Sequence, residues 1–305
     1  MKILVFTEKP FAPAAVKAIE NAVNASGNDL EIVEEGTRQD LLEAIKDADG
    51  LIVRSDKITA DIMDAAPKLK TIVRAGAGYD NIDLEAATKH GICVMNTPGQ
   101  NSNAVAELVF GMIIMMCRNQ YNGKSGSELK GKSLGLYAFG QVSRNVARIA
   151  KGFDMKLSAL DTFVPDVMME GEGVKPLHDP KELFSENDFV SLHIPATPET
   201  KGSIGYDLVM LMPKNGVLIN TARKEVIDEP GLIKALEERP DLRYVADVKP
   251  DNAEEFEKKF GARVFFTPKK MGAQTAEANY NAGVAAAEQV IAYLKDGWNK
   301  FQVNK

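Results

Sequence analysis

The chain has 305 residues, enough for two domains of about 150 residues each, so a single small module is excluded. Thirty-seven Lys and Arg against 43 Asp and Glu give a formal charge of −6, and 45% of the residues are hydrophobic. This balance is typical of a folded protein. It argues against disorder, and against a protein that binds nucleic-acid phosphates, which needs a basic surface.

The two cysteines, Cys93 and Cys117, lie in apolar stretches. They are expected to be buried free thiols rather than a disulfide, which indicates a reducing compartment. The N-terminus MKILVFTEKP has no cleavable apolar core, and the most apolar run, residues 108–117, is half of a membrane span. We therefore expect a cytoplasmic protein with no membrane partner, no nucleic-acid partner and no metal.

Short β-rich runs alternate with amphipathic helical stretches in the first third of the chain. Apolar strands flanked by helices predict a parallel sheet that is covered on both faces. This first unit is expected to end near residues 96–99. Its predicted strands are residues 3–6, 31–33, 51–54, 71–74 and 92–95, and its clearest helices lie near 12–25 and 38–47.

A long helix near 101–118 leads into a Gly-, Ser- and Lys-rich segment, which marks a loop before a second α/β series. A final Ala-rich helix is predicted near 275–295 and is expected to pass back to the first unit. The predicted organisation is a discontinuous domain of residues 1–99 and 285–305 and a continuous domain of residues 100–284. The strands of the second series are predicted at residues 134–138, 156–161, 189–194, 217–220, 243–248 and 264–267.

The strongest local signal is a strand, a tight turn, a helix and a second strand that ends on an acid, between residues 132 and 161. In a dinucleotide-binding fold, glycines let the turn approach a pyrophosphate at the helix N-terminus, and an acid about 20 residues later bonds the ribose hydroxyls. Here Asp161 follows Gly140 by 21 residues. The usual G-x-G-x-x-G reads Ala138-Phe139-Gly140-Gln141-Val142-Ser143, in which only the middle glycine remains.

Asp161 indicates which dinucleotide is bound. A carboxylate at this position hydrogen-bonds a 2′-hydroxyl and repels a 2′-phosphate, so we expect NAD rather than NADP. Arg144 is a weak signal in the opposite direction. The alternative is an ordinary strand–helix–strand unit with an acid at a strand end.

The segments 74–98, 101–108, 219–232 and 267–278 together resemble the D-2-hydroxyacid dehydrogenases, and within that family most closely the phosphoglycerate dehydrogenases. The resemblance covers nearly the whole chain in family order. It implies a Rossmann-type NAD-binding domain, residues 100–284, and a flavodoxin-like substrate-binding domain built from both chain ends. It also implies a homodimer, formed through the helix near 101–118.

The resemblance also assigns candidate site residues. Arg223, after the strand at 217–220, matches the family's arginine and can bond carboxylate and carbonyl oxygens together. The turn Ala75-Gly76-Ala77-Gly78 can offer backbone N–H groups to a substrate carboxylate. Arg54, next to Ser55, and Arg74 match arginines that face a substrate phosphate; salt bridges to Asp56 or Asp80 are the alternative. The remaining cofactor-contacting positions implied by the family are His193, Thr221, Ala222 and Asp247.

The family's acid–base histidine, directly after Thr-Pro, is missing. Aligned on Thr267-Pro268 its place falls to Lys269, and aligned on Gly272-Ala273 it falls to Lys270. A lysine is already a competent proton donor for reduction. As a base near pH 7 its reference pKa of ~10.4 must fall by roughly 3 units, and we expect burial beside Arg223 to act in that direction.

The family's glutamate partner of that histidine is also missing, because Asn252 stands five residues after Asp247. This loss is consistent with a lysine, since a nearby carboxylate would raise the lysine pKa. Asp251, Glu254 or Glu255 remain open as helpers, the alternative being a solvated face with Lys258 and Lys259. The chain ends at Lys305, so no appended regulatory domain is expected.

Three functions are compatible with these residues. The leading expectation is NAD-dependent oxidation of 3-phosphoglycerate to 3-phosphohydroxypyruvate for serine biosynthesis, with Arg223 as anchor and Lys269 or Lys270 as acid and base. The second is reduction of glyoxylate, hydroxypyruvate or another 2-oxo acid. The third, from a different class, is a non-catalytic NAD-sensing interaction protein, which the missing histidine and glutamate favour and the retained arginines oppose.

Overall fold

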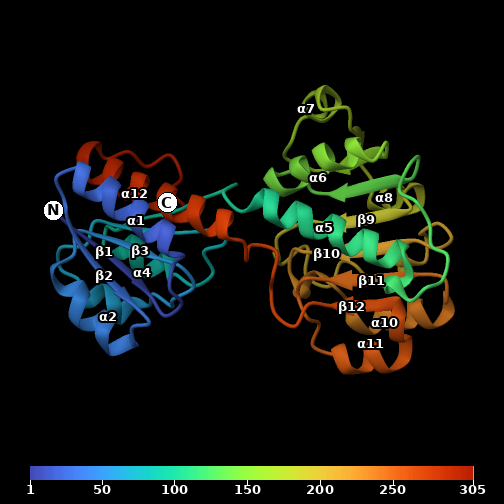
Figure 1. Ribbon diagram of the computed structural model, residues 1–305, viewed down its shortest axis with the longest axis horizontal. Helices are drawn as coiled ribbons and strands as arrows, with labels where there is room; N and C mark the ends of the chain where they lie inside the picture. Colours follow the sequence, from blue (N-terminus) through green and yellow to red (C-terminus); the bar gives the residue numbers. More distant parts are fainter. Residues whose placement is uncertain (305) are drawn as a thin grey trace. The chain divides into compact units, whose positions relative to one another are not determined.

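The structure is a computed structural model that describes residues 1–304, and it divides into two compact units (Figure 1). Unit 1 contains Met1–Asn101 and the chain from Gln274 onward, and unit 2 contains Ser102–Ala273. Each unit has one parallel sheet with helices on both faces, so the predicted α/β fold class is confirmed. Within residues 1–304, no helix has the length and apolar character needed to span a membrane.

The five-stranded sheet of unit 1 has the strand order β2-β1-β3-β4-β5 and is parallel throughout, which is the flavodoxin-like arrangement. All five strands lie where the sequence predicts them. They are β1 (Lys2–Thr7), β2 (Asp29–Glu34), β3 (Gly50–Val53), β4 (Thr71–Arg74) and β5 (Cys93–Asn96). The helices are α1 (Pro13–Ala25), α2 (Arg38–Ala44), η1 (Ile45–Asp47), α3 (Ala60–Asp64), α4 (Leu84–Lys89) and α12 (Ala276–Asp296).

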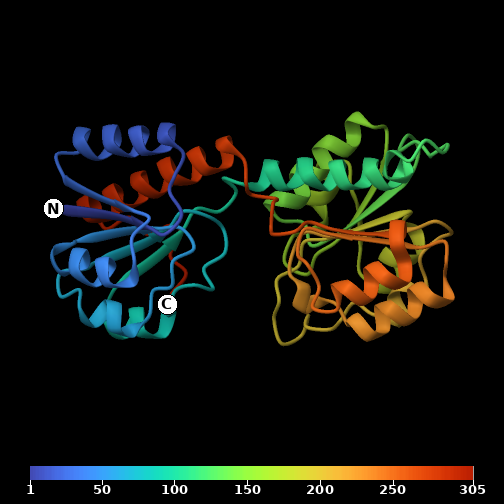
Figure 2. The same ribbon diagram turned by 60° about the horizontal axis from the view of Figure 1, so that its bottom comes forward.

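Two apolar clusters hold unit 1 together, one on each face of its sheet. Helices α1 and α12 cover one face, seen in blue and red in Figure 2, and α2, α3 and α4 cover the other. Strands β3 and β4 are almost entirely buried because side chains on both of their faces enter these clusters. The two clusters fix the strand ends that carry Arg54 and Arg74.

The C-terminal helix α12 makes unit 1 discontinuous and also corrects the predicted boundary. Thr275 caps its N-terminus, and Gly297, with φ +70°, ends it. Ala282, Ala286 and Val290 on this one continuous helix pack into the core of unit 1. A single packed helix cannot be divided at residue 285, so the boundary lies at Gln274 instead.

The seven-stranded sheet of unit 2 has the order β12-β11-β10-β9-β6-β7-β8, all parallel, which is the Rossmann order with an added strand. The six predicted strands are present, and the short β8 was not predicted. The strands are β6 (Ser133–Tyr137), β7 (Lys156–Leu160), β8 (Lys175–Leu177), β9 (Phe189–Leu192), β10 (Val217–Asn220), β11 (Arg243–Ala246) and β12 (Val264–Phe266).

Helices cover both faces of the unit 2 sheet. Helices α5 and α6 pack on one face, and α8 to α11 pack on the other. Cys93 in unit 1 and Cys117 at the end of α5 are free and buried, as predicted. The helices are α5 (Ser102–Cys117), η2 (Asn119–Tyr121), α6 (Gln141–Gly152), α7 (Asp166–Gly171), α8 (Pro180–Glu186), α9 (Tyr206–Val209), η3 (Lys224–Val226), α10 (Glu229–Glu238), α11 (Ala253–Phe260) and η4 (Gly261–Arg263).

Candidate active site

The carboxyl ends of the unit 2 strands form one edge of the sheet, and the order reverses between β6 and β9. Ligands of open parallel sheets bind at this edge, at the point of reversal. The structure places Ala138, Asp161, His193, Thr221 and Asp247 there, each directly after a strand. The sequence-predicted cofactor residues therefore share one edge of one unit.

The turn between β6 and α6 is built without its first glycine. Ala138 takes that position with φ +78°, a left-handed conformation that ordinarily favours glycine. The Ser143 hydroxyl donates to the Ala138 carbonyl over 2.6 Å and holds the turn. Gly140 precedes α6, and a Cβ built on it would meet nothing within 4 Å. The first N–H groups of α6, from Gln141 and Val142, have no acceptor within their own helix and suit an anion.

Asp161 has a second role that the sequence did not indicate. One carboxylate oxygen accepts from Phe139 N over 2.7 Å, and the other accepts from Phe163 N at 2.7 Å and Val164 N at 3.0 Å. A carboxylate has about four acceptor positions, so three are occupied and about one is left for a ribose hydroxyl. Phe139 contributes only backbone to this site, because its side chain is fully buried in the core.

Arg144, the residue that weakly favoured NADP, is already engaged. Its Nη1 pairs with Glu172 Oε1 over 2.6 Å, and its guanidinium lies 5.2 Å from the centroid of the Phe139 ring. A 2′-phosphate would have to compete with Glu172 for this charge. The contacts of Arg144 therefore agree with NAD.

Three polar atoms at this edge are buried without a hydrogen-bond partner among the described residues: Ser191 Oγ, His193 Nε2 and Thr221 Oγ1. Ser191 lies on β9, His193 follows the end of the same strand, and Thr221 follows the neighbouring β10. Burial lowers the pKa of His193 to about 3, so its ring is neutral at physiological pH and not an acid–base group. Buried unpaired polar atoms are costly, and their presence here fits residues that await a bound cofactor.

Arg223 lies in a turn fixed by a buried asparagine. Asn220 accepts from Ala222 N over 2.9 Å through Oδ1 and donates to the Arg223 carbonyl over 2.9 Å through Nδ2. Arg223 itself is half-buried, and its Nη1 donates to the Ala222 carbonyl. The turn therefore sets the direction in which the guanidinium leaves the end of β10.

The loop with the two candidate lysines is anchored by Asp247. This fully buried carboxylate accepts from Thr267 Oγ1 over 3.0 Å, Met271 N over 2.6 Å and Gly272 N over 2.7 Å. Lys269 and Lys270 lie between these anchors and are exposed. The expected burial beside Arg223 is therefore wrong, because the three bonds fix the Thr267 hydroxyl and the backbone of Met271 and Gly272 and leave both lysine side chains outside the core.

Unit 1 has its own point of strand reversal, between β1 and β3, and Arg54 lies there. Its Nη1 donates to the carbonyls of Lys9 and Pro10 over 2.9 and 2.6 Å, and its Nη2 donates to Asn279 Oδ1 over 2.6 Å. Asp56 accepts from the Arg54 backbone N–H rather than from its guanidinium. Partial burial lowers the pKa of Arg54 from its ordinary value, but a guanidinium stays charged. Ser55 next to it is exposed.

Arg74 and the glycine turn after β4 pack together. Arg74 Nε donates to the Arg54 carbonyl over 2.8 Å. Gly76 has φ +152°, and a Cβ there would lie 1.6 Å from Arg74 Nη1, so only glycine fits. Asn96 Nδ2 holds the Ala77 carbonyl over 2.6 Å. Within residues 1–304, no partner is seen for the N–H groups of Ala77 and Gly78, which are thus available to a carboxylate.

Comparison with known proteins agrees with this geometry. Residues 3–304 match the family model described as D-isomer specific 2-hydroxyacid dehydrogenase, catalytic domain. The chain belongs to this family. A D-3-phosphoglycerate dehydrogenase of Methanocaldococcus jannaschii is 38% identical over 97% of the chain and 58% of that protein. A hydroxypyruvate reductase of Thermotoga maritima is 35% identical over 87% of the chain and 92% of that protein.

A solved structure resembles this member of the 2-hydroxyacid dehydrogenases along its full length. It is an NAD⁺-bound 3-phosphoglycerate dehydrogenase of Entamoeba histolytica, 49% identical, with a TM-score of 0.90 over 100% of this chain and 99% of that one. The expected cofactor, NAD, is thereby confirmed. The chain spans 58% of the length of the Methanocaldococcus relative, which is just over half.

Several residues that shape the candidate sites of the two units were not predicted from the sequence. Asn220 was part of the quoted segment 219–232, but nothing indicated that its side chain would hold the arginine turn. Glu229 accepts from Asp251 N and Asn252 N, both over 2.8 Å, and fixes the loop after β11. Thr97, with its buried and unpaired Oγ1, follows β5 in unit 1. Of the solvated face expected with Lys258 and Lys259, the structure shows the pair of Glu255 with Lys259, whereas Asp251 pairs with Lys224 instead.

Proposed function

We propose that this chain oxidises 3-phosphoglycerate to 3-phosphohydroxypyruvate with NAD⁺, as a step toward serine. The observation that carries the proposal is the single edge of unit 2 at which Asp161, Arg223 and the lysine loop all lie. The 49% identity to an NAD⁺-bound phosphoglycerate dehydrogenase supports this choice of substrate. Unit 1 is the proposed binding unit for the acidic groups of the substrate.

In the reaction, the C2–H bond of the alcohol breaks and a carbonyl forms. NAD⁺ supplies the hydride acceptor. Arg223 bonds the substrate oxygens and stabilises charge that develops on the C2 oxygen. The N–H groups of Ala77 and Gly78 bond the carboxylate, and Arg54 and Arg74 attract the phosphate.

The hydroxyl proton is assigned to Lys269 or Lys270. During reduction the ammonium donates its proton to the carbonyl oxygen. During oxidation the ammonium must first lose its proton to solvent, and the neutral amine then accepts the proton from the C2 hydroxyl. Asp247 is the proposed positioning residue, since it fixes the backbone on both sides of the lysines. His193 is left out of proton transfer because burial lowers the pKa of its ring to about 3, so the ring does not retain a proton near neutral pH.

A second function, reduction of glyoxylate or hydroxypyruvate, is favoured by the contacts of Arg54. Three of its five guanidinium N–H groups are already donated to Lys9, Pro10 and Asn279. Only two N–H groups remain for a phosphate, whereas a substrate without phosphate needs neither of them. The hydroxypyruvate reductase of Thermotoga maritima belongs to the same set of relatives.

Steady-state turnover with matched substrates separates the proposals. NADH formation from 3-phosphoglycerate is compared with NADH consumption by 3-phosphohydroxypyruvate, hydroxypyruvate and glyoxylate. The proposed function requires kcat/KM to be at least about tenfold higher for 3-phosphohydroxypyruvate than for hydroxypyruvate, because one charge-assisted hydrogen bond has about that value. The reverse order establishes the small-acid reductase. No turnover of any acid, with NAD still bound, indicates the NAD-sensing protein.

We further propose that the enzyme is a homodimer that acts in the cytoplasm. The dimer contact is assigned to α5, on which Leu108, Ile114 and Met115 are apolar and only half-buried against the core of unit 2. Two buried free thiols support a reducing compartment. Sedimentation of the full chain tests the assembly: Ile114→Glu is expected to shift a dimer to a monomer, whereas Lys124→Glu, at an exposed position after α5, is not.

A further inference from the structure

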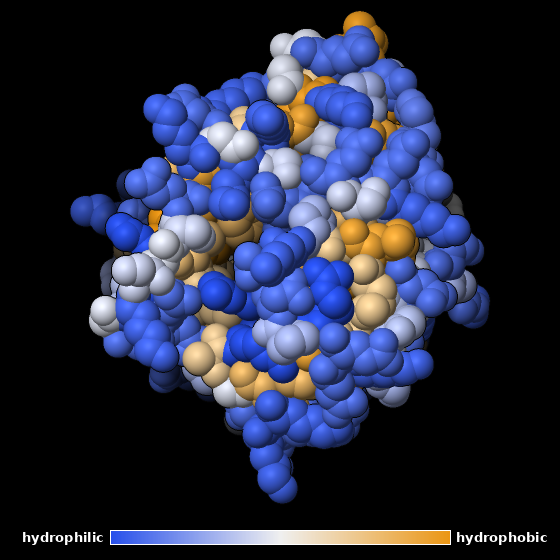
Figure 3. Space-filling view, turned by 90° about the vertical axis from the view of Figure 1, so that its right-hand side faces the viewer, coloured by the Kyte–Doolittle hydropathy of each residue, from blue (hydrophilic) through white to orange (hydrophobic). Residues whose placement is uncertain are grey.

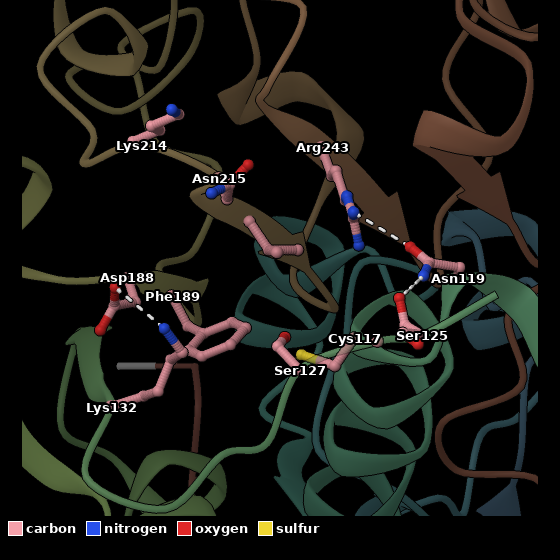
Figure 4. A pocket seen from close by; sticks show the side chains of 12 residues that line it. Cys117, Asn119, Ser125, Ser127, Lys132, Asp188, Phe189, Lys214, Asn215 and Arg243 are labelled. Atoms are coloured by element: carbon pink, nitrogen blue, oxygen red, sulfur yellow. Dashed lines mark hydrogen bonds and ion pairs between the residues drawn. The ribbon is translucent and has the colours of Figure 1, made fainter.

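A cavity of about 240 Å³ lies at the opposite edge of the unit 2 sheet, where the strands begin (Figure 4). Its walls include the first residues of β9, β10 and β11, which are Phe189, Val217 and Arg243. All strands of a parallel sheet start at the same edge, so this cavity is on the far side from Asp161 and Arg223. Figure 3 shows the molecule from the side of this edge. Hydrophilic residues cover most of that face, and apolar residues are visible in the hollows between them.

Cationic side chains outnumber acids in the cavity wall. Lys132, Lys214 and Arg243 line it, and the only acid among the lining residues is Asp188. Lys132 Nζ is 3.9 Å from Asp188 Oδ1, at the limit of an ion pair. The other carboxylate oxygen already accepts from Ser133 N and Oγ, over 2.9 and 3.0 Å. An excess of positive charge is notable in a chain whose formal charge is −6.

Lys214 and Arg243 are not neutralised by carboxylates. Lys214 is exposed and has no ion-pair partner within residues 1–304. Among the described residues, Arg243 donates only to neutral acceptors, the Met116 carbonyl and, over 3.2 Å, Asn119 Oδ1. The first of these bonds caps the C-terminus of α5, so part of the guanidinium charge offsets the helix dipole. The positive charge that is not neutralised therefore comes mainly from Lys214, since Lys132 is paired with Asp188 over 3.9 Å.

The wall beside Arg243 is held in a strained conformation. Asn119, Gln120 and Tyr121 have φ of +50°, +53° and +56°, three successive non-glycine residues in the left-handed region. Such strain persists only where surrounding contacts enforce it and is concentrated at functional sites. Asn119 is fixed by its Nδ2 bond to the Ser125 carbonyl over 2.8 Å and in turn orients Arg243 (Figure 4).

The floor of the cavity is apolar and carries no opposing charge. Phe189 and Val217 are 3% and 2% exposed. Burial raises the pKa of the Cys117 thiol, so it remains neutral. Ions interact more strongly across an apolar floor than in bulk water. The Ser125 and Ser127 side chains border the same space and add hydroxyl groups.

We propose that this cavity is a second anion site, separate from the cofactor and substrate sites, that binds a phosphate dianion. Lys132 and Lys214 attract the dianion and Arg243 offers its oriented guanidinium from a third direction. The same chemistry fits free phosphate or the phosphate group of a small ester, since the cavity has room beyond one phosphate.

Calorimetric titration of the full chain, saturated with NAD, tests the site at constant ionic strength. Inorganic phosphate and glycerol 3-phosphate are titrated separately, which distinguishes the free ion from the ester. Lys132→Met/Lys214→Met is expected to weaken binding of both at least about tenfold, because two charged donors are removed. Lys181→Met/Lys201→Met removes two exposed unit 2 lysines and is expected to leave the affinity unchanged.

Two further variants keep the test decisive. Lys214→Glu, at an exposed position that folding does not depend on, is expected to abolish binding by placing a carboxylate in the wall. In phosphate-free buffer, neither this variant nor the double variant should change kcat or KM for the hydroxy acid. Unchanged phosphate affinity in both Lys214→Glu and Lys132→Met/Lys214→Met overturns the site. Loss of binding in Arg54→Met also overturns it, because that result would assign the phosphate to unit 1.

Discussion

The two units hold their candidate cations in opposite ways. In unit 1, the Arg54 side chain is bonded to two carbonyls and one amide oxygen, so the charge itself is fixed. In unit 2, Asp247 fixes the backbone around Lys269 and Lys270, and their side chains are exposed. A fixed guanidinium suits binding of an anion, whereas a lysine on an anchored loop suits movement of a proton to and from a substrate. The difference predicts which kinetic constant each residue controls.

The largest effect is expected at the lysines. We expect either Lys269→Met or Lys270→Met to lower kcat by about 10²- to 10⁴-fold, the usual contribution of a general acid or base, with little change in KM. The other substitution should have a much smaller effect. Lys258→Met, at another exposed position of unit 2, is the matched control. Full kcat in the double variant Lys269→Met/Lys270→Met would remove both lysines from the mechanism.

Arg54 is expected to control KM. Arg54→Met should raise KM for 3-phosphohydroxypyruvate about a hundredfold, because two charge-assisted bonds to the phosphate are lost, and should leave KM for glyoxylate unchanged. Arg38→Met, which removes an exposed unit 1 arginine paired with Asp61, is the control. An equal rise for both substrates would show that Arg54 supports the fold of the site rather than the phosphate, and a thermal melt would reveal the accompanying loss of stability.

Asp247 tests whether the loop anchor matters for the lysines. Asp247→Asn replaces one acceptor oxygen by a donor that faces a backbone N–H, so the free energy of unfolding should fall by about 1–3 kcal/mol. We expect kcat to fall about tenfold as the lysine loop loosens. Asp207→Asn, on an exposed residue of unit 2 away from the lysine loop, is the control. A rise in KM for NAD with kcat unchanged would instead support the cofactor contact expected from the sequence.

Most of the backbone could be predicted from local patterns, and the exceptions have physical reasons. Buried parallel strands are continuous apolar runs, so eleven of the twelve strands were recognised; β8 has three residues and contains Pro176. The five helices α7 to α11 were not predicted, although Asp179-Pro180 and Pro230 are ordinary start signals for α8 and α10. The boundary at 285 was wrong because α12 packs as one element.

The site was harder to predict than the fold. Asp161 was predicted as a cofactor residue from its spacing, but its three bonds to backbone N–H groups depend on how residues 139 and 163–164 fold around it. Asn220 and Asp247 act through hydrogen bonds to the backbone of nearby loops, and no pattern of residues in the sequence predicts such bonds. The lysine burial was wrong for the same reason, since an anchored loop places its backbone inside and its long side chains outside.

His193 gives the smallest predicted effect and the sharpest contrast with the exposed lysines. Its folded pKa of about 3 lies below the ordinary value of 6.5, so between these values the unfolded chain binds the proton that the folded chain excludes. Stability is therefore complete above about pH 6.5 and falls as the pH decreases, by at most ~1.4 kcal/mol per pH unit.

Urea denaturation between pH 7 and pH 4 measures this slope, and comparison of variants isolates it. His90 acts with the opposite sign, because its bonds to the Ala86 carbonyl and Asp64 raise its pKa, so the wild-type slope alone is ambiguous. His193→Gln should flatten the acid-side decline, and His178→Gln, with a side chain 73% exposed, should not. If the His193→Gln and wild-type slopes coincide, the ring is protonated in the folded chain, and the argument that leaves proton transfer to the lysines loses its main support.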